Sequence, residues 1–324
     1  MERDDVAAVC GLIDKVFGNR NPLRPNGQEV LEWMYFSGAI KDRIPRAFVI
    51  ADEHSVVGHI GLTLSELSDG DQSLSVVQTA NWVVDPDHKV GLLSLRLMQE
   101  ALSQGEAAII IGGTEDTHRV IPKLGFKKRL DVERYIKVIK PAQYLAMSRS
   151  GLGLARNAGK LMMFLANSPL SLFRGGAISA SPRRVLRNAL NADFLNWYEQ
   201  CPQGIVHTLK LHDEGTTPLG QATVLIQSGK GNCYANLLNV DAETNAPSVW
   251  SDIVRAAERF LRDKGVTHIN TLATFEPLRQ ALKEQGYCRV NRLPLWVRDK
   301  DKRLNGVEAW HLTAIEGDLG YLLE

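Results

Sequence analysis

The chain has 324 residues, of which 44% are hydrophobic and 23% charged, and its formal net charge is +1. This composition excludes a disordered chain, and no apolar run approaches the roughly 20 residues that a membrane-spanning helix needs. The four cysteines lie far apart and show no C-x-x-C spacing, so we expect reduced thiols and no metal site. The acidic N-terminus lacks the apolar core of a secretory signal, which favours a cytoplasmic protein.

Positive charge is concentrated in one part of the chain. Residues 127–187 contain thirteen lysines and arginines but only two acidic residues, and residues 141–191 contain no carboxylate at all. Such asymmetry is typical of a segment with an anionic neighbour, for example a membrane surface. It is equally typical of a segment that pairs with acidic faces of its own protein. Both interpretations stay open at the level of the sequence.

Hydrophobic periodicity and turn residues predict an α+β arrangement in the first half of the chain. We expect helices at residues 6–17, 28–36, 92–102 and 114–123. We expect strands at residues 46–51, 56–64, 75–84, 109–111 and 134–139. The order is two helices, an antiparallel meander, and then strand, helix, strand, helix.

The second half repeats this order. Helices are expected at residues 192–199, 249–264 and 275–285, and strands at residues 206–211, 220–227, 233–240, 266–272 and 293–297. The last helix of each half ends in a glycine followed by an aromatic residue, Gly125-Phe126 and Gly286-Tyr287. We therefore predict a tandem duplication of one α+β unit.

Residues 141–190 separate the two halves. Arg149, Arg156 and Lys160 share one helical face, and apolar residues including Leu161 share another. This pattern predicts a basic, amphipathic, helical connector, which either packs on both domains or rests on an anionic membrane or lipid-linked substrate. The predicted organisation is thus an N-terminal domain at 1–140, a connector at 141–190 and a C-terminal domain at 191–324.

Residues 79–94 carry the strongest local signal. A β-rich run is followed by a turn at Asp85-Pro86, by a basic turn that contains Gly91, and then by a helical segment. A strand, a short loop and a helix in this order direct free backbone N–H groups at an anion. A second signal follows about thirty residues later, where Gly112-Gly113 ends a strand and Leu124-Gly125-Phe126 ends the next helix.

These two motifs resemble the core of the GNAT superfamily of acyl-CoA N-acyltransferases. The run Val56-Val57-Gly58-His59 resembles the second strand of that core, and the tail at 310–321 resembles tandem GNAT-like proteins of bacterial surface-polysaccharide and amino-acyl ligation pathways. The resemblance implies two tandem GNAT-like domains, each with a mixed, mostly antiparallel sheet flanked by helices.

The resemblance also implies a donor site for acetyl-CoA or another acyl-CoA, in which a strand and its loop contact pantetheine and pyrophosphate. The residues implied are Trp82, Val83, Val84, His88, Lys89, Val90, Gly91, Leu92, Leu93 and Ser94. Gly91 matches the central glycine of the family's phosphate loop, whereas His88 and Leu93 depart from its pattern. The corresponding loop of the second half, at 241–248, has no glycine and two carboxylates that would repel pyrophosphate. We therefore assign the donor site to the first half.

Candidate catalytic residues are sparse. The family often places a tyrosine acid four residues before the glycine of the Leu-Gly-Phe turn, where this chain has Ile121. His118 is the candidate substitute, and Glu115 and Asp85 are candidate bases. Each has an ordinary structural interpretation as well: Glu115 as a charge at a helix start, His118 as a surface residue and Asp85 as a turn former.

The leading functional prediction is a cytoplasmic N-acyltransferase, with possible attachment to the inner membrane surface through residues 141–190. Its acceptor is predicted to be an amine, on an amino sugar or a glycolipid intermediate. One alternative is a Fem-like transferase that uses aminoacyl-tRNA, and only this alternative requires nucleic acid. Another is a non-catalytic scaffold, which Ile121 and Leu93 favour.

Overall fold

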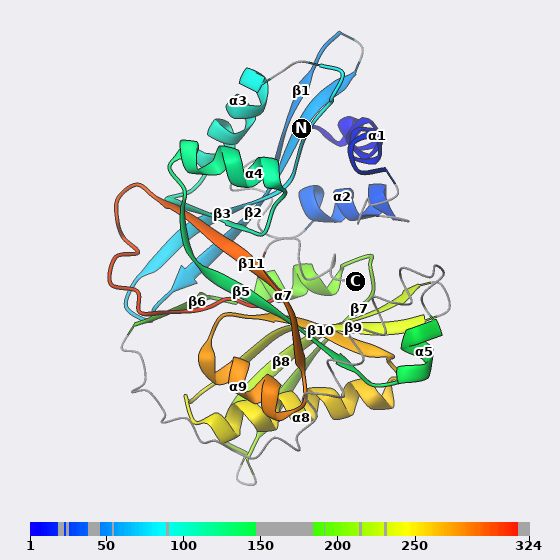
Figure 1. Ribbon diagram of the computed structural model, residues 1–324, viewed down its shortest axis with the longest axis vertical. Helices are drawn as coiled ribbons and strands as arrows, with labels where there is room; N and C mark the ends of the chain where they lie inside the picture. Colours follow the sequence, from blue (N-terminus) through cyan, green and yellow to red (C-terminus); the bar gives the residue numbers. More distant parts are fainter. Residues whose placement is uncertain are drawn as a thin grey trace.

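A computed structural model describes residues 1–18, 23, 26–37, 46–53, 55–88, 91–146, 184–190, 192–213, 216–229 and 232–316. Helices surround one large mixed sheet, which connects the upper and lower parts of the molecule in Figure 1. Most of the predicted basic connector, residues 147–183, lies outside the described residues.

The first half folds as its sequence pattern predicts. Its helices are α1 (Val6–Phe17), α2 (Gly27–Phe36), α3 (Gly91–Leu102), α4 (Glu115–Val120), the 3-10 turn η4 (Ile121–Leu124) and α5 (Pro141–Ala146). Its strands are β1 (Ala47–Ala51), β2 (Val56–Ser68), β3 (Ser73–Val84), β4 (Ala107–Ile111) and β5 (Lys127–Val138). Gly125 adopts the left-handed conformation at φ 87° that ends η4, which is why a glycine stands in the Leu-Gly-Phe turn.

The predicted elements of the second half are also present. Its helices are α7 (Ala192–Glu199), α8 (Pro247–Asp263) and α9 (Glu276–Glu284). Its strands are β6 (Val185–Asn188), β7 (Ile205–His212), β8 (Pro218–Gly229), β9 (Asn232–Ala242), β10 (His268–Ala273), β11 (Cys288–Asp299) and β12 (Ala309–His311). The prediction of a helical connector is wrong at its end, because β6 pairs with β2 and β12 and buries Val185 and Leu186.

The two halves exchange a strand. Along the sheet the order is β12-β6-β2-β3-β4-β11-β5-β10-β9-β8-β7, and β1 also pairs with β2. Strand β11 of the second half lies between β4 and β5, and β5 of the first half lies between β11 and β10. The predicted boundary at residue 140 therefore follows a strand that pairs on both edges with the second half. The division into two domains stays a prediction.

Strand pairing repeats on either side of this exchange. The series β1, β2, β3, β4, β11 corresponds to the series β7, β8, β9, β10, β5. Both β3–β4 and β9–β10 are parallel pairs, and a helix, α3 or α8, connects the two strands of each pair. A tandem duplication predicts this pattern, and the duplication itself stays a prediction.

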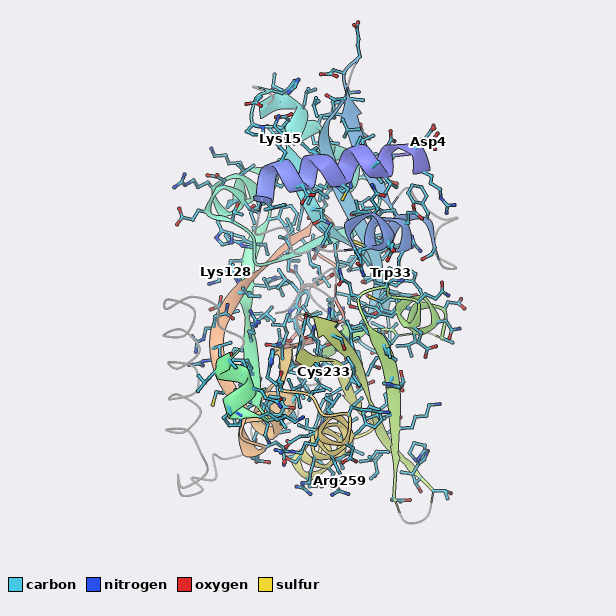
Figure 2. All side chains as sticks on the ribbon, turned by 90° about the vertical axis from the view of Figure 1, so that its right-hand side faces the viewer. Asp4, Lys15, Trp33, Lys128, Cys233 and Arg259 are labelled. Atoms are coloured by element: carbon cyan, nitrogen blue, oxygen red, sulfur yellow. The ribbon has the colours of Figure 1, made fainter. Side chains whose placement is uncertain are left out.

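A reciprocal tryptophan contact joins α2 to α7. The Trp33 indole N–H donates to the Trp197 carbonyl at 2.8 Å, and the Trp197 indole N–H donates to the Trp33 carbonyl at 3.1 Å. Their rings stack with centroids 4.5 Å apart, and both side chains are buried. Figure 2 labels Trp33 in the region where the two halves meet. Helices 164 residues apart in the chain are thus held by stacking and two buried hydrogen bonds.

Different helices cover the two faces of the first-half sheet. On one face, Ile60 and Leu62 of β2 pack in a cluster with side chains of α3 and η4. On the other face β2 meets α2, and Gly61 leaves room for Tyr35, because a Cβ at Gly61 would lie 1.9 Å from the Tyr35 hydroxyl oxygen. Alternate residues of β2 therefore point to different helices: one set points toward α3 and the other toward α2.

Candidate functional site

Strands β3 and β4 diverge after a short parallel pairing. Residues 76–78 of β3 pair with residues 107–109 of β4, and β3 then continues to Val84 alongside β2 alone. Among the described residues, no third segment forms backbone hydrogen bonds to both diverging ends. Over residues 79–84, the edge of β3 that faces β4 therefore pairs with no other described strand. We call this region the open end of β3 and β4.

A bulge lies within the open end. Gly61 stands opposite Ala80 and His59 opposite Val83, so Asn81 and Trp82 together face one residue of β2. Asn81 has φ 50°, which is uncommon for a residue other than glycine. Such a bulge bends the strand and redirects its backbone groups, and bulges are frequent beside active sites.

The corresponding region of the second half is filled by the chain itself. Strands β9 and β10 pair over residues 235–237 and 269–271 and then diverge. The Ile315 N–H donates to the Leu238 carbonyl of β9 at 2.9 Å, and Thr313 bridges to Ala273 of β10. Residues 312–316, which we call the closing segment, thus lie between the two strands.

The closing segment ends in a buried carboxyl group. Glu316 is 1% exposed, and the Thr313 N–H donates to its Oε2 at 2.6 Å. Burial raises the pKa of Glu316 from 4.5 to about 8. Between these two pH values the folded protein binds the proton more strongly than the unfolded chain, so the Glu316 contribution to stability falls as the pH rises.

We therefore expect Glu316→Gln to be more stabilising at pH 8 than at pH 5, with each unit of pKa difference worth about 1.4 kcal/mol. Urea unfolding of both proteins at pH 5, 6.5 and 8 measures this difference. His59 and His311 have pKa values lowered to about 4 by burial and change stability in the opposite direction below pH 6.5. Since both proteins contain them, the difference between the proteins isolates Glu316. Equal pH dependence would contradict a buried, protonated carboxyl group.

Helix α3 begins at Gly91, next to the open end. Its twelve residues place the partial positive charge of a helix N-terminus there, which suits a phosphate group. Leu92 is 84% exposed, and Leu93 and Ser94 are partly buried. Lys89 and Val90, both predicted to contact the donor, lie outside the described residues.

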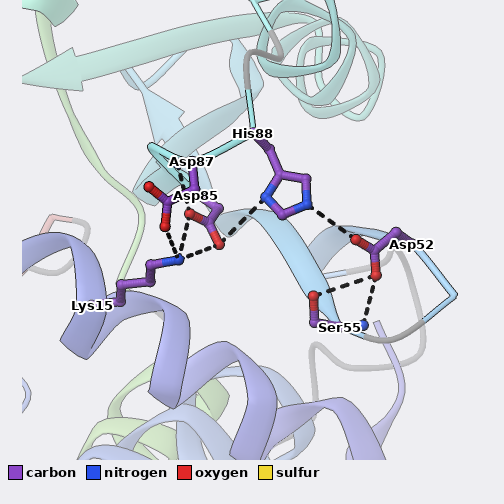
Figure 3. A network of polar contacts seen from close by, with 6 residues as sticks. All are labelled: Lys15, Asp52, Ser55, Asp85, Asp87 and His88. Carbon is purple, nitrogen blue, oxygen red and sulfur yellow. Dashed lines mark hydrogen bonds and ion pairs between the residues drawn. The ribbon is translucent and has the colours of Figure 1, made fainter.

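A network of ion pairs and hydrogen bonds stabilises the turn at residues 85–88, before α3 (Figure 3). Lys15 of α1 lies 2.8 Å from a carboxylate oxygen of Asp85 and 2.8 Å from one of Asp87. His88 lies between Asp52, at 3.1 Å, and Asp85, at 3.5 Å. The hydrogen bond from Lys15 and then that from the Asp87 N–H lower the pKa of Asp85. A carboxylate so engaged accepts a proton poorly, and the geometry favours Asp85 as a turn former rather than as a base.

Glu115 lies on the surface. Its side chain is 90% exposed, and it pairs with Arg119 one turn later at 3.6 Å. Thr114 caps this helix by accepting a hydrogen bond from the Thr117 N–H at 3.3 Å. A carboxylate in the first turn of a helix is stabilised by the helix dipole, so its position has a structural reason of its own.

His118 lies where β4 ends and is partly buried. Its Nε2 is 2.9 Å from the carbonyl oxygen of Gly112, and because a carbonyl only accepts, Nε2 carries the hydrogen. In the neutral ring, Nδ1 is then the proton acceptor. The ring also lies 5.9 Å from that of Trp296. Of the three candidates, only His118 combines partial burial at the open end with an available basic nitrogen.

Three buried donors near the open end find no hydrogen-bond partner among the residues that the structure describes. They are the side-chain N–H groups of Asn81, Trp82 and Trp296. Trp82 and Trp296 both pack against the cluster beneath α3. A buried unpaired donor costs about 1–3 kcal/mol, which an acceptor atom on a ligand would offset. No local signal in the sequence marks Trp296, because the strand exchange alone brings β11 beside β4.

Solved structures show which fold this is. The chain is similar to the N-myristoyltransferase of Saccharomyces cerevisiae with bound myristoyl-CoA, with a TM-score of 0.56 at 10% identity over 92% of this chain and 80% of that chain. It is similar to a GCN5-related N-acetyltransferase of Anabaena variabilis, with a TM-score of 0.55 at 10% identity over 92% and 71% of the two chains. A probable N-acyltransferase of Enterococcus faecalis gives a TM-score of 0.54 at 11% identity over 92% and 71%. The fold is that of the GNAT-type N-acyltransferases.

The GNAT fold confirms the predicted fold class, a mixed sheet flanked by helices. At identities near 10% the likeness shows the fold alone. No known protein family profile matches the sequence, and no curated protein matches it. The Fem-like or polysaccharide-related type therefore stays a prediction, as do the individual site residues. Within the described part of this GNAT-fold chain, no helix has the length and hydropathy to cross a membrane.

Proposed function

We propose that the chain is an acyl-CoA N-acyltransferase whose donor binds in the open end of β3 and β4. The observation that carries this proposal is the contrast between the two halves: no described segment pairs with both strands at the open end, whereas the closing segment fills its counterpart. The similar solved structures support it, because one of them holds myristoyl-CoA and another is a GCN5-related N-acetyltransferase.

Pantetheine suits the open end because it is extended and contains two amide groups, so it pairs with a free strand edge as a peptide does. In this arrangement the pyrophosphate lies at the N-terminus of α3, where the helix begins at Gly91. The unpaired indole N–H groups of Trp82 and Trp296 are then hydrogen-bond donors for the amide carbonyl oxygens of pantetheine. Binding would thus satisfy groups that the protein leaves unpaired.

In the proposed reaction the amine nitrogen attacks the thioester carbonyl carbon, the C–N bond forms, and the C–S bond then breaks. The amine loses one proton, and the thiolate of coenzyme A gains one. His118 is the residue that we propose for this proton transfer, because Nδ1 accepts a proton while Nε2 stays bonded to Gly112. Backbone N–H groups of the bulge stabilise the oxyanion.

The acceptor that we propose is an amine on an amino sugar or a glycolipid, and the donor is acetyl-CoA or a longer acyl-CoA. The excess of lysine and arginine in residues 127–187 supports an acceptor with negative charge or an anionic membrane surface. The charge excess indicates only that the acceptor or its surroundings are negatively charged. An assay therefore has to vary both the acyl length of the donor and the acceptor.

Incubation with acetyl-CoA or myristoyl-CoA and a panel of amino sugars tests the proposal. We expect release of free coenzyme A that depends on the amine, with an acylated amine of matching mass in the product mixture. His118→Ala is expected to lower the rate by about 100-fold or more, in keeping with the usual contribution of a general acid or base. Donor binding without transfer to any amine would contradict the enzyme proposal and support the scaffold alternative.

A further inference from the structure

His59 is a buried histidine that the predicted chemistry does not use. It lies on β2 opposite the bulge, and its side chain is 0% exposed. Its Nδ1 is 2.9 Å from the carbonyl oxygen of Asn81, so Nδ1 carries the hydrogen and donates it. Its ring faces α2, where the ring centroid of Tyr35 lies 5.5 Å away. Burial lowers its pKa to about 4, so the ring is neutral at neutral pH.

This hydrogen bond fixes the direction of one peptide group. In a trans peptide the C=O and the following N–H point in opposite directions. Since the Asn81 carbonyl points to His59 of β2, the N–H of Trp82 points away from β2. In the proposed function the donor pairs with this other edge of β3, and its pyrophosphate lies at the start of α3.

The hydrogen bond from His59 acts on the bulge itself. Asn81 has φ 50°, a left-handed conformation that few residues adopt, although asparagine adopts it more readily than most. Within the described part of the chain, the side-chain amide nitrogen of Asn81 is buried without a hydrogen-bond partner. The neutral imidazole of His59 is the group that holds the Asn81 carbonyl.

We propose that His59 is a positioning residue for acyl transfer: it holds the Asn81 carbonyl and thereby directs the Trp82 N–H to the thioester oxygen of the donor. This inference rests on the proposed function. A fixed donor stabilises the negative charge that grows on this oxygen as the tetrahedral intermediate forms, and it needs no rearrangement at that moment. His59 itself touches neither substrate.

Two substitutions separate this role from simple packing. His59→Leu fills the site without a donor, whereas in His59→Asn the side-chain amide replaces Nδ1–H. We expect His59→Leu to lower kcat by about 10- to 100-fold while the affinity for coenzyme A stays within about threefold, and we expect His59→Asn to restore most of kcat. The 13C chemical shift of the carbonyl carbon of bound [1-13C]acetyl-CoA measures the hydrogen bond to the thioester oxygen. The carbonyl signal is expected to move downfield on binding to the wild type and to His59→Asn, but not on binding to His59→Leu.

An unchanged carbonyl shift and kcat in His59→Leu would overturn the inference. Equal losses of affinity and kcat in both variants would overturn it as well, because they indicate a packing role. If His59→Leu fails to fold, Asn81→Val alters the same peptide and leaves the imidazole in place, and it is expected to lose the shift while Asn81→Gly keeps it. Failure of the wild type to bind acetyl-CoA at all would instead count against the proposed function.

Discussion

Trp197→Ala is expected to lower the free energy of unfolding by about 3–5 kcal/mol, the usual cost of removing a buried tryptophan. The side chain is 4% exposed, stacks on Trp33, and exchanges two hydrogen bonds with it. Truncation leaves a cavity and removes one of the donors to the Trp33 carbonyl, which also accepts from the Ser37 hydroxyl. Guanidinium unfolding followed by circular dichroism measures the loss.

Trp197→Phe is the matched control for this prediction. It keeps an aromatic ring but removes the N–H, so we expect a smaller loss of about 1–3 kcal/mol. A double-mutant cycle with Trp33→Ala then tests reciprocity, because two residues that act through one contact lose less together than the sum of their separate losses. Strictly additive losses would contradict a direct contact between α2 and α7.

The second large effect is expected at Gly91. Glutamate at this position places a negative charge at the N-terminus of α3, where the helix dipole favours it, so α3 should stay folded. The same charge opposes a pyrophosphate, and we expect the affinity for coenzyme A to fall by about 100-fold or more. Calorimetric titration measures the affinity, and thermal unfolding checks the fold.

Gly11→Glu is the control for the added charge. Gly11 lies on an exposed face of α1, and a Cβ there meets nothing within 4 Å. This variant carries the same net charge as Gly91→Glu, so it should bind coenzyme A like the wild type. Equal weakening in both variants would assign the effect to overall charge rather than to the start of α3.

Local patterns in the sequence predicted most of the elements, because helix periodicity and turn residues are local properties. Helix α1 has its predicted bounds, and the Leu124-Gly125-Phe126 turn ends its helical segment as predicted. The exchange of β5 and β11 was not predicted, since each half contains a plausible partner for its own strand. The strand β6 was missed because its four residues are stabilised by β2 and β12, which are distant in the sequence.

The candidate site was predictable where it depends on the backbone and much less so where it depends on side chains. Strand β3 and helix α3, which begins at Gly91, lie where the local motif predicted a strand and a helix. Asp85 carries an ion pair with Lys15 that links residues 70 positions apart, and no spacing rule indicates it. His59 is one residue of an ordinary strand, and only the register of β2 against β3 places it opposite the bulge.

We propose that the first half alone binds the donor. Calorimetric titration of the full chain with coenzyme A tests this proposal, because it counts sites as well as measuring affinity. We expect one site per chain, which Gly91→Glu removes and Gly11→Glu retains. Two sites per chain, or one site that Gly91→Glu leaves unchanged, would contradict it.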